Sequence, residues 1–498
     1  MSCALHMAAQ DMAADILDRT FSRSLPVASA TEAAYRSDPA AMYFRDSVQL
    51  STVAAHYDFL SKSQPVMVQL GTGHNLAGLE ASSYMPLHDG AKVWGNASFT
   101  AGQYRDIRFT DCIDYLYIAP YVLGDEAGGD LSTRRYDFSG GYARDFGRMV
   151  VGAELRYRAE IAHRNVDPRI KTIVSDLHIQ AAASYRLSED YTAGISLGAD
   201  IYNQDCDVDF YNPINDINTL TLTGMGTYYK RFMGNANKNS GYHSTGIKAG
   251  LHLLPVSGHG IFANVDFSTY RMEQQLRNFN NLILGYTDNK LLQARVIYRT
   301  TDHAIFRAAP GIVAGMMLRK GTENLFGTAA GASYDKIGSR SPYAHDIYFG
   351  RVECPMQLTF GQSTLSATPA AGYMLNKESY TDPQRRLEAS RISPALTFDY
   401  RLLTSGRWAC SASAGGILDF ATEKKRVLTG LGTGTALGRS VIHNFDMLCA
   451  DARTFAFTAG ASCSIGRQVV SLTATYTHTA YSGHGSSQNV SVILSSTF

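Results

Sequence analysis

The chain has 498 residues, of which 45% are hydrophobic and 18% charged, and its formal net charge at pH 7 is +1. No run of eighteen apolar residues occurs, which excludes a membrane protein built from spanning helices. The balanced charge, without a basic patch, argues against a nucleic-acid partner. The 29 tyrosines and 22 phenylalanines, set against 2 tryptophans, suit the aromatic girdles of a membrane β-barrel.

The N-terminus resembles the end of a secretory signal peptide. In residues 1–10 an apolar stretch is followed by small residues, and Asp11 begins a more polar segment. A basic leader is missing, so we expect the true start to lie upstream and cleavage to fall near Gln10; lipidation of Cys3 is the alternative. Residues 11–46, partly helix-like at 12–17, then form a periplasmic segment that could enter a barrel as a small plug. This segment is too short for the globular plug of a TonB-dependent transporter.

Residues 47–498 contain long segments in which apolar and polar residues alternate. From Val470 to Ala480 the alternation continues without a break, which predicts strands with one apolar and one polar face. The last segment, 489–498, ends on Phe498, and a terminal aromatic is typical of outer-membrane barrels. A soluble sandwich or propeller is the alternative, although no repeat of fixed period supports a propeller.

Connections between these segments are alternately short and long. Short turns are expected at 87–90, 146–148, 188–190, 257–260, 300–303, 360–362, 404–407 and 466–468. Long connections are expected at 61–73, 105–134, 164–171, 205–241, 274–287, 320–342, 379–386, 422–450 and 482–486.

The pattern predicts an all-β, transmembrane antiparallel barrel of about 18 strands with long external loops and both termini periplasmic. Sixteen strands are the nearest alternative. Residues 218–231 also alternate, but counting them would break the short–long rhythm. We therefore assign them to a hairpin within a long external loop.

The same alternation predicts which charged residues face the lumen. A charge on the lipid face would cost about 2–4 kcal/mol near the midplane, so the register is strongly fixed. These side chains could line a water-filled channel or brace the wall as cross-strand ion pairs. The predicted lumen-lining residues are Glu154, Arg156, Arg158, Glu160, Asp266, Arg295, Arg299, Arg351, Glu353, Asp399 and Arg401.

Two further features suggest ligands or cross-links. Asp205, Asp207 and Asp209 resemble the start of a calcium loop, although the glycine and glutamate of such a loop are missing. They are candidates for a structural calcium site, with a solvated acidic loop as the alternative. No cysteine pair forms a CxxC motif; a Cys112–Cys206 bridge between loops is one interpretation, and small apolar residues on strands the other.

Candidates for catalysis are few. His243 and Ser244 near one strand end, and His478 with His484 near the last loop, are the nearest to a hydrolytic set at the outer rim. None has the local signature of a nucleophile, so we expect a protein that is not an enzyme.

The segments 114–123, 128–129, 136–142 and 167–169 resemble a family of outer-membrane β-barrel proteins from Bacteroidota. The resemblance covers essentially the whole chain after residue 10. It implies an outer-membrane location beside TonB-dependent receptors and surface lipoproteins, with no catalytic or binding residues to carry over.

The expected function is therefore uptake of nutrients or metal complexes. The barrel, surrounded by outer-membrane lipids, would act as a pore or as an accessory subunit of a complex between a TonB-dependent receptor and a lipoprotein. A membrane-embedded lipid or peptide hydrolase is the alternative. The long loops 105–134, 205–241 and 422–450 are the expected recognition surface, unless they fold over the barrel mouth and close it.

Overall fold

The computed structural model describes residues 16–45, 49–212, 217–234, 238–301, 305–330, 333–404 and 407–498. The signal-peptide remnant 1–10 and the first residues of the 11–46 segment lie outside these ranges, as do parts of the turns expected at 300–303 and 404–407. Among the described residues, no helix is long and apolar enough to cross a membrane.

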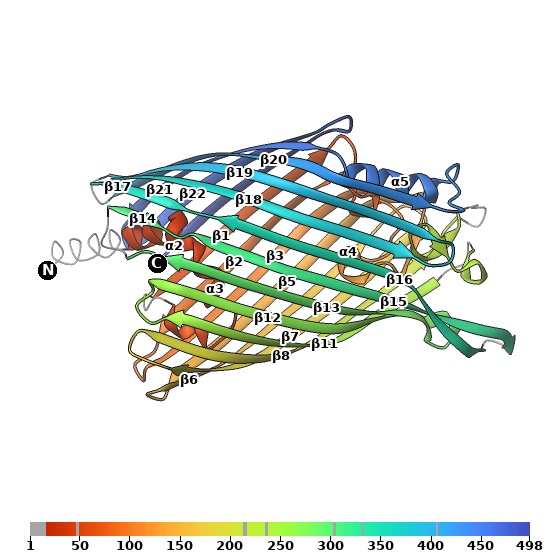
Figure 1. The fold of residues 1–498 in the computed structure, drawn as a ribbon, viewed down its shortest axis with the longest axis horizontal. Coiled ribbons are helices and arrows are strands. Elements are labelled where there is room, and N and C mark those ends of the chain that lie inside the picture. The colour runs from red at the N-terminus through yellow and green to blue at the C-terminus, as the bar shows by residue number, and fades with distance from the viewer. Residues whose placement is uncertain are drawn as a thin grey trace.

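Eighteen long strands form a closed antiparallel barrel (Figure 1). The first strand pairs with the last, through Thr52 and Thr497 among others, so the described wall has no free edge. The barrel strands are β1 (Leu50–Lys62), β2 (Gly73–Pro86), β3 (Ala91–Ile107), β5 (Gly129–Asp145), β6 (Met149–His163), β7 (Arg169–Arg186), β8 (Tyr191–Asp209), β11 (Lys238–Pro255), β12 (Gly260–Leu276), β13 (Leu282–Arg299), β15 (Gly311–Ala330), β16 (Ser333–Glu353), β18 (Ser363–Tyr380), β19 (Arg385–Thr404), β20 (Trp408–Leu428), β21 (Ala452–Ile465), β22 (Gln468–Tyr481) and β23 (Gly485–Thr497).

The prediction of eighteen strands is confirmed, and sixteen is wrong. Two short strands, β14 (Phe306–Ala308) and β17 (Met356–Phe360), pair with each other and widen the sheet at one rim. The 218–231 segment is not part of the wall, as the rhythm of the connections predicted.

On the barrel strands, large apolar side chains of the alternating pattern lie on the outer face. Val151 and Leu155 on β6 are exposed, whereas Gly152 and Glu154 between them are buried. Large apolar residues are exposed in the same way on β12 and β19. An apolar outer surface of this extent is stable only against lipid or another apolar phase.

The two ends of the barrel differ. The start of β1 and the end of β23 lie at the end with the short turns, and the longer connections lie at the other. Two of the expected long loops are largely strand. β15 and β16 pair as far as Ala330 and Ser333, so most of 320–342 is a projecting hairpin, and β18 and β19 leave only 381–384 as a turn. Two antiparallel strands can extend beyond the rest of the barrel wall as long as each provides backbone hydrogen-bond partners for the other.

Segments of three long connections come together at the long-loop end. β4 (Val122–Asp125), β9 (Thr219–Gly224) and β10 (Thr227–Tyr228) form a separate three-stranded sheet. Beside it lie the short helices α4 (Tyr115–Ile118) and η3 (Lys230–Phe232), and the longer α5 (Ala436–Leu448). We call residues 108–128, 219–234 and 436–448 the cap. Two further 3-10 turns, η2 (Val68–Leu70) and η4 (Arg277–Phe279), lie in neighbouring connections.

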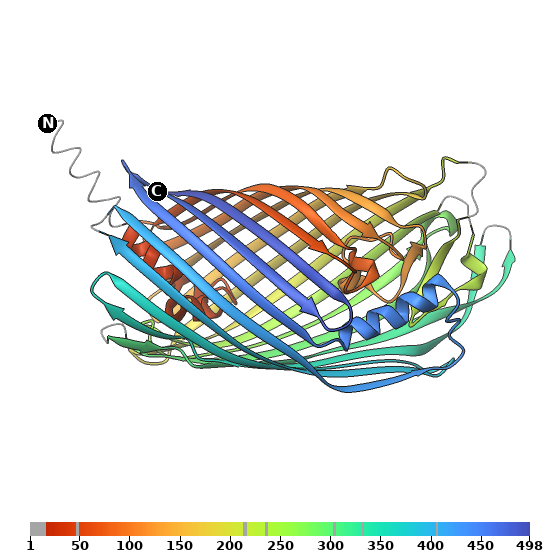
Figure 2. The ribbon, with the colours of Figure 1, turned by 90° about the horizontal axis from the view of Figure 1, so that it is seen from above.

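The N-terminal segment lies inside the barrel at the short-turn end (Figure 2). It consists of helical residues 16–24, α2 (Pro26–Ala30), α3 (Glu32–Tyr35) and η1 (Ala41–Phe44). We call residues 16–45 the insert. Its apolar residues Val27, Ala34 and Tyr35 pack on Leu254 and Phe262 of the inner wall, and the rings of Tyr35 and Phe262 meet edge to face at 5.5 Å.

Candidate functional site

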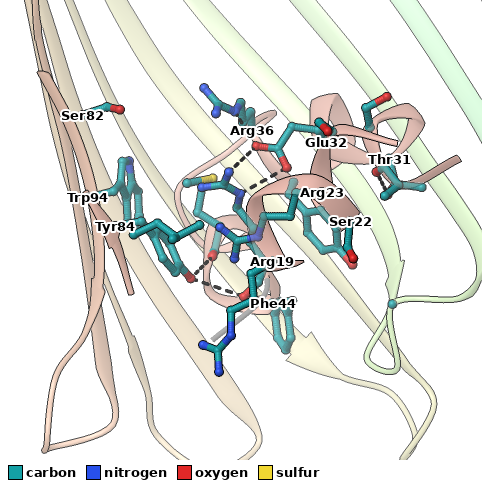
Figure 3. Close-up of a pocket in the computed structure, with 18 of the residues that line it drawn as sticks. Arg19, Ser22, Arg23, Thr31, Glu32, Arg36, Phe44, Ser82, Tyr84 and Trp94 are labelled. Carbon is teal, nitrogen blue, oxygen red and sulfur yellow. Dashed lines mark hydrogen bonds and ion pairs between the residues drawn. The ribbon is translucent and has the colours of Figure 1, made fainter. Parts of the chain in front are cut away.

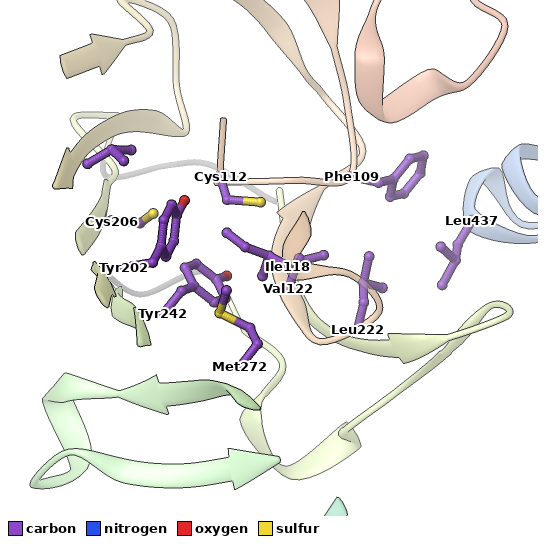
Figure 4. Packing of buried hydrophobic residues seen from close by; sticks show 11 residues of the cluster. Phe109, Cys112, Ile118, Val122, Tyr202, Cys206, Leu222, Tyr242, Met272 and Leu437 are labelled. Atoms are coloured by element: carbon purple, nitrogen blue, oxygen red, sulfur yellow. The ribbon is translucent and has the colours of Figure 1, made fainter. Parts of the chain in front are cut away.

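The cap has an apolar core that it shares with the barrel wall (Figure 4). Ile118 and Val122 of the 105–134 loop meet Leu222 of β9 and Leu437 of α5. The wall contributes a second set of buried side chains to the same cluster: Val174, Tyr202, Cys206, Tyr242 and Met272. An apolar core that runs from wall to loops excludes water from this part of the lumen.

Two arginines of the wall side bind carboxylates of the cap. Arg158 on β6 contacts Asp114 at 2.6 Å, and the Tyr202 hydroxyl donates to the same carboxylate at 2.7 Å. Arg164 contacts Asp125 of β4 at 2.6 Å, and both side chains are only 2% exposed. A buried pair of this kind becomes strongly destabilising when one partner is removed.

A third arginine binds the backbone of the cap. Arg319 on β15 is buried and donates to the carbonyl oxygens of Leu116, Tyr117 and Ala119 at 3.0, 3.2 and 2.6 Å. These carbonyls lie at the C-terminal end of α4, where a helix has no intrahelical donors left and a cation is favoured.

A buried carboxylate completes this side of the cap. Asp111 accepts hydrogen bonds from Ser240 and, at 2.6 Å, from Tyr242 on β11. The Tyr242 oxygen in turn accepts from the backbone nitrogen of Leu123 at 2.9 Å. Burial raises the pKa of Asp111 to about 6, because the hydrogen bonds offset only part of the desolvation.

The far side of the cap is bound to other strands. Arg385 on β19 donates to the carbonyl of Met225, and Arg391 to that of Leu448 at the end of α5. His443 of α5 donates to the carbonyl of Pro65 at 2.7 Å. The cap is therefore attached to β6, β11, β15 and β19, and it crosses the mouth of the barrel.

At the opposite end, the insert and the inner wall enclose a cavity of about 1350 Å³ (Figure 3). Its lining reaches the rim, since it includes the turn between β11 and β12. We call this cavity the basic chamber, because nine of its lining residues are Lys or Arg and four are Asp or Glu. The cations are Arg19, Arg23, Arg36, Arg45, Lys92, Arg156, Arg186, Arg299 and Arg307, and the carboxylates are Asp18, Glu32, Glu80 and Glu154.

Polar contacts fix the insert against this wall. Glu32 contacts Arg36 at 2.8 Å and Arg45 at 2.7 Å. Burial alone would raise the pKa of Glu32, but the two guanidinium groups outweigh it and lower that pKa. Lys92 of β3 donates to the carbonyls of Tyr43 and Arg45 at 2.5 and 3.1 Å. The insert therefore has a defined position and does not fill the whole lumen.

Three buried residues form a hydrogen-bonded series that the sequence did not predict. Ser184 on β7 is hydrogen-bonded at 2.8 Å to Nε2 of His252 on β11, and Nδ1 of His252 is hydrogen-bonded to Asp38 of the insert. The connectivity is that of a serine–histidine–aspartate set. However, Ser184 is only 1% exposed, so no substrate reaches it. The series of hydrogen bonds instead attaches the insert to the wall through Asp38. No local motif could reveal it, because the three residues lie on three separate segments.

The predicted lumen-lining residues divide among several surroundings. Glu154, Arg156 and Arg299 line the basic chamber, and Arg158 and Glu160 lie below the cap. Arg401 is hydrogen-bonded to Ser24 of the insert. Arg351 and Glu353 pair with each other at 3.0 Å. The remaining members, Asp266, Arg295 and Asp399, are not among the residues that line the chamber.

The three aspartates of the expected calcium loop lie on a strand. Asp205, Asp207 and Asp209 are alternate residues of β8, on the face opposite the buried Gln204 and Cys206. The prediction of a loop is therefore wrong, because β8 pairs as far as Asp209. The extended backbone spreads the carboxylates along the strand. Within the described ranges, no group of three or more His, Cys, Asp or Glu residues could hold a metal ion.

Of the other candidates from the sequence, His478 lies on β22, and His484 lies in the turn between β22 and β23. His243 and Ser244 are neighbours on β11, so their side chains point to opposite faces and cannot act as a pair. His243 is hydrogen-bonded to Asn203 at 2.6 Å, and Ser244 to Tyr117 at 3.2 Å. The thiols of Cys112 and Cys206 are both free and both belong to the apolar core of the cap, so they are not bridged.

Comparison with solved structures finds distant likenesses to outer-membrane proteins. No curated protein matches the chain. A mutant of the ferric enterobactin receptor PfeA from Pseudomonas aeruginosa has 8% identity and a TM-score of 0.41 over 91% of this chain and 81% of that chain. The copper transporter OprC has 8% identity and a TM-score of 0.39, covering 89% and 80%. A bacterial polysaccharide outer membrane secretin has 10% identity and a TM-score of 0.34, covering 91% and 98%.

These likenesses are too low to assign a role to this chain. A family model, by contrast, matches residues 39–498, which is most of the chain and includes the end of the insert and the whole barrel. The chain belongs to the family of unknown function described as DUF6850.

Proposed function

We propose that this protein is an integral outer-membrane β-barrel that takes part, without catalysis, in the uptake of nutrients or metal complexes. The exposed apolar outer face supports insertion into a lipid bilayer. The short turns and both termini would then be periplasmic, and the cap would face the cell exterior.

The observation that carries the proposal is the cap. A passive pore needs a continuous path of water, whereas Tyr121, Val122 and Leu123 are fully buried within the mouth. Buried ion pairs and hydrogen bonds hold these segments to strands on different sides of the wall. We therefore favour a gated barrel that opens with a partner, as an accessory to a TonB-dependent receptor or surface lipoprotein, over a permanently open pore.

Planar-bilayer recording tests this proposal. We expect the intact protein to be nearly silent, and a variant in which residues 219–234 are replaced by a short Gly-Ser linker to conduct. Heat-modifiable migration in gel electrophoresis should show that both barrels are folded. Isolation of the intact protein from outer membranes should recover a partner. Steady conductance by the intact protein would contradict a gated barrel and favour a simple pore.

The hydrolase alternative has no geometric support among the described residues. His243 and Ser244 point to opposite faces, and Ser184 is enclosed. A hydrolytic activity that is lost on changing Ser244 to Ala would still overturn the non-enzymatic proposal.

A further inference from the structure

The inner wall of the barrel has two unlike sides. On β7, β8 and β11 many inward residues are buried beneath the insert and the cap, among them Gln180 and Ser244. Gln180 donates to the carbonyl of Ser37 of the insert at 3.3 Å, and Ser244 is hydrogen-bonded to Tyr117 of the cap at 3.2 Å. On β20 to β23, by contrast, most inward residues are only partly buried, so water in the lumen reaches them.

Hydroxyl groups dominate this open side. Large apolar residues such as Phe457, Leu472 and Leu494 are exposed on the outer face of these strands, so the residues that alternate with them face inward. On β22 every inward residue from 471 to 479 is a serine or a threonine. We call six of these partly buried inward residues the hydroxyl track: Thr454, Thr458, Thr473, Thr475, Thr477 and Ser491.

The track continues from strand to strand. Thr454 of β21 is hydrogen-bonded through its hydroxyl to Thr479 of β22 at 2.9 Å. Thr458 is hydrogen-bonded to Thr475 in the same way at 3.0 Å. Each hydroxyl has one donor and two acceptor sites, so a pair of this kind keeps a donor and further acceptor sites for a solute. The hydroxyl of Thr473 has no hydrogen-bond partner within the described ranges.

The open side carries almost no charge. On β21, β22 and β23, all of which the structure describes, no inward residue is Asp, Glu, Lys or Arg. On β20 the first such residue is Asp419, which accepts a hydrogen bond from Ser393. A charged solute that gives up water here finds no counter-charge, which costs free energy. A solute with many hydroxyls, however, exchanges hydrogen bonds with water for hydrogen bonds with the track.

Both ends of the open side meet regions that are already described. At the short-turn end the insert packs on Ala409 and Val469, and the hydroxyl residues begin beyond them. The basic chamber includes Thr52 and Thr497 of the adjoining strands in its lining, which provides an approach beside the insert. At the other end, α5 connects β20 to β21 and lies at the mouth (Figure 1).

We propose that the hydroxyl track binds an uncharged, hydroxyl-rich solute of oligosaccharide chemistry. Alternate residues of a strand lie about 7 Å apart and neighbouring strands about 5 Å apart, so the track presents a regular array of hydroxyls to a chain of sugar rings. That this sugar is the cargo of the barrel rests on the proposed function. The binding itself requires only the track.

The test uses the full chain with its cap intact, folded in an amine-oxide detergent, which has no sugar headgroup. The neutral trisaccharide maltotriose and the anionic trisaccharide trigalacturonate are compared by saturation-transfer NMR, with aromatic protons of the protein irradiated and empty micelles as the blank. We expect transfer to maltotriose to exceed transfer to trigalacturonate about threefold or more, because the track cannot replace the hydration of the carboxylates.

Matched variants decide whether the track is responsible. Thr473→Val, Thr475→Val and Thr477→Val combined remove three hydroxyls with little change of shape, and should weaken maltotriose binding about threefold or more. Serine at the same three positions is the control, because it keeps each hydroxyl and loses only a methyl group. This control should bind as the unchanged chain does. Heat-modifiable migration should show that both variants are folded.

Three results would overturn the proposal: no transfer to maltotriose above the blank, equal or stronger transfer to trigalacturonate, or unchanged maltotriose binding in the valine variant. The hydroxyls would then serve only to pair neighbouring strands. Steady conductance by the intact protein in bilayers would contradict the gated barrel and leave sugar binding standing. Failure of sugar binding by a silent protein would remove the solute class and leave the gated barrel standing.

Discussion

The cap and the insert both lie in the lumen, but the cap has an apolar core whereas the insert borders a polar cavity. The cap surrounds an apolar core, and its charged groups are buried in pairs such as Arg164 and Asp125. The insert packs a few apolar residues, among them Val27 and Tyr35, on the wall and leaves a polar cavity beside them, where Arg36 is largely exposed. One end of the barrel is therefore closed by a packed structure, while the other end admits water.

This difference indicates which region could act as a gate. Opening the cap requires that buried pairs separate, which is costly without a partner that replaces them. The insert can stay in place while small solutes enter beside it. Variants of the two regions should therefore have separate effects.

The largest effect is expected from Asp125→Ala. It leaves Arg164 buried without its partner, which costs about 3–5 kcal/mol. Hydrogen exchange in residues 108–128 should accelerate and bilayer conductance should appear, with the insert unchanged. A double variant, Asp125→Leu with Arg164→Met, should recover much of the protection. Full protection in the single variant would show that the cap does not depend on this pair.

Arg319→Met should have the next largest effect. It removes the donors to three carbonyls of the α4 segment. Water replaces part of what is lost, so we expect a net cost of about 1.5–3 kcal/mol for the charged group as a whole. We expect brief, frequent openings in bilayer recordings. The control is Arg271→Met, an exposed arginine of β12 that pairs with Asp288 outside the cap. Equal behaviour of the two variants would contradict a specific role for Arg319.

The cap should be more stable at acidic pH. The pKa of Asp111 is about 6 in the folded protein, against an ordinary value of 3.8 in an unfolded chain. Folding therefore favours the protonated form of this carboxyl group. The resulting stabilisation is fully present below about pH 4 and is lost as the pH rises to about 6. It amounts to at most about 3 kcal/mol. Hydrogen exchange of residues 108–128 should therefore accelerate over this window. Asp111→Asn should remove the dependence, and a persistent slope would implicate another group.

The smallest effect is expected from His252→Leu, and it should be confined to the insert. This change removes the imidazole that is hydrogen-bonded to both Asp38 and Ser184, at a cost of about 1–3 kcal/mol, although Asp38 still accepts from the backbone nitrogen of Ala41. Limited proteolysis should cut residues 16–45 faster, with the cap still closed. His243→Leu lies on the same strand but the opposite face and should not affect the insert. Release of the cap by His252→Leu would show that the two regions are coupled.

The barrel wall could be predicted from the amino-acid pattern alone. Alternation with period two assigns each residue to one face, and a shift by one residue would turn every apolar side chain inward, so strand number and register could be predicted. Segment 218–231 was rightly kept out of the wall on the rhythm of the connections. The length of the β15–β16 hairpin was missed, because polar strands outside a membrane have no apolar face to mark them.

What fills the lumen depends on contacts between residues that are far apart in the chain. Arg319 lies 200 residues from Ala119, and Tyr242 lies 131 residues from Asp111, yet each pair is hydrogen-bonded. No local pattern encodes such contacts, since each depends on how the closed wall brings distant strands around one mouth. The same holds for the basic chamber, whose lining residues come together only when the insert folds against the inner wall.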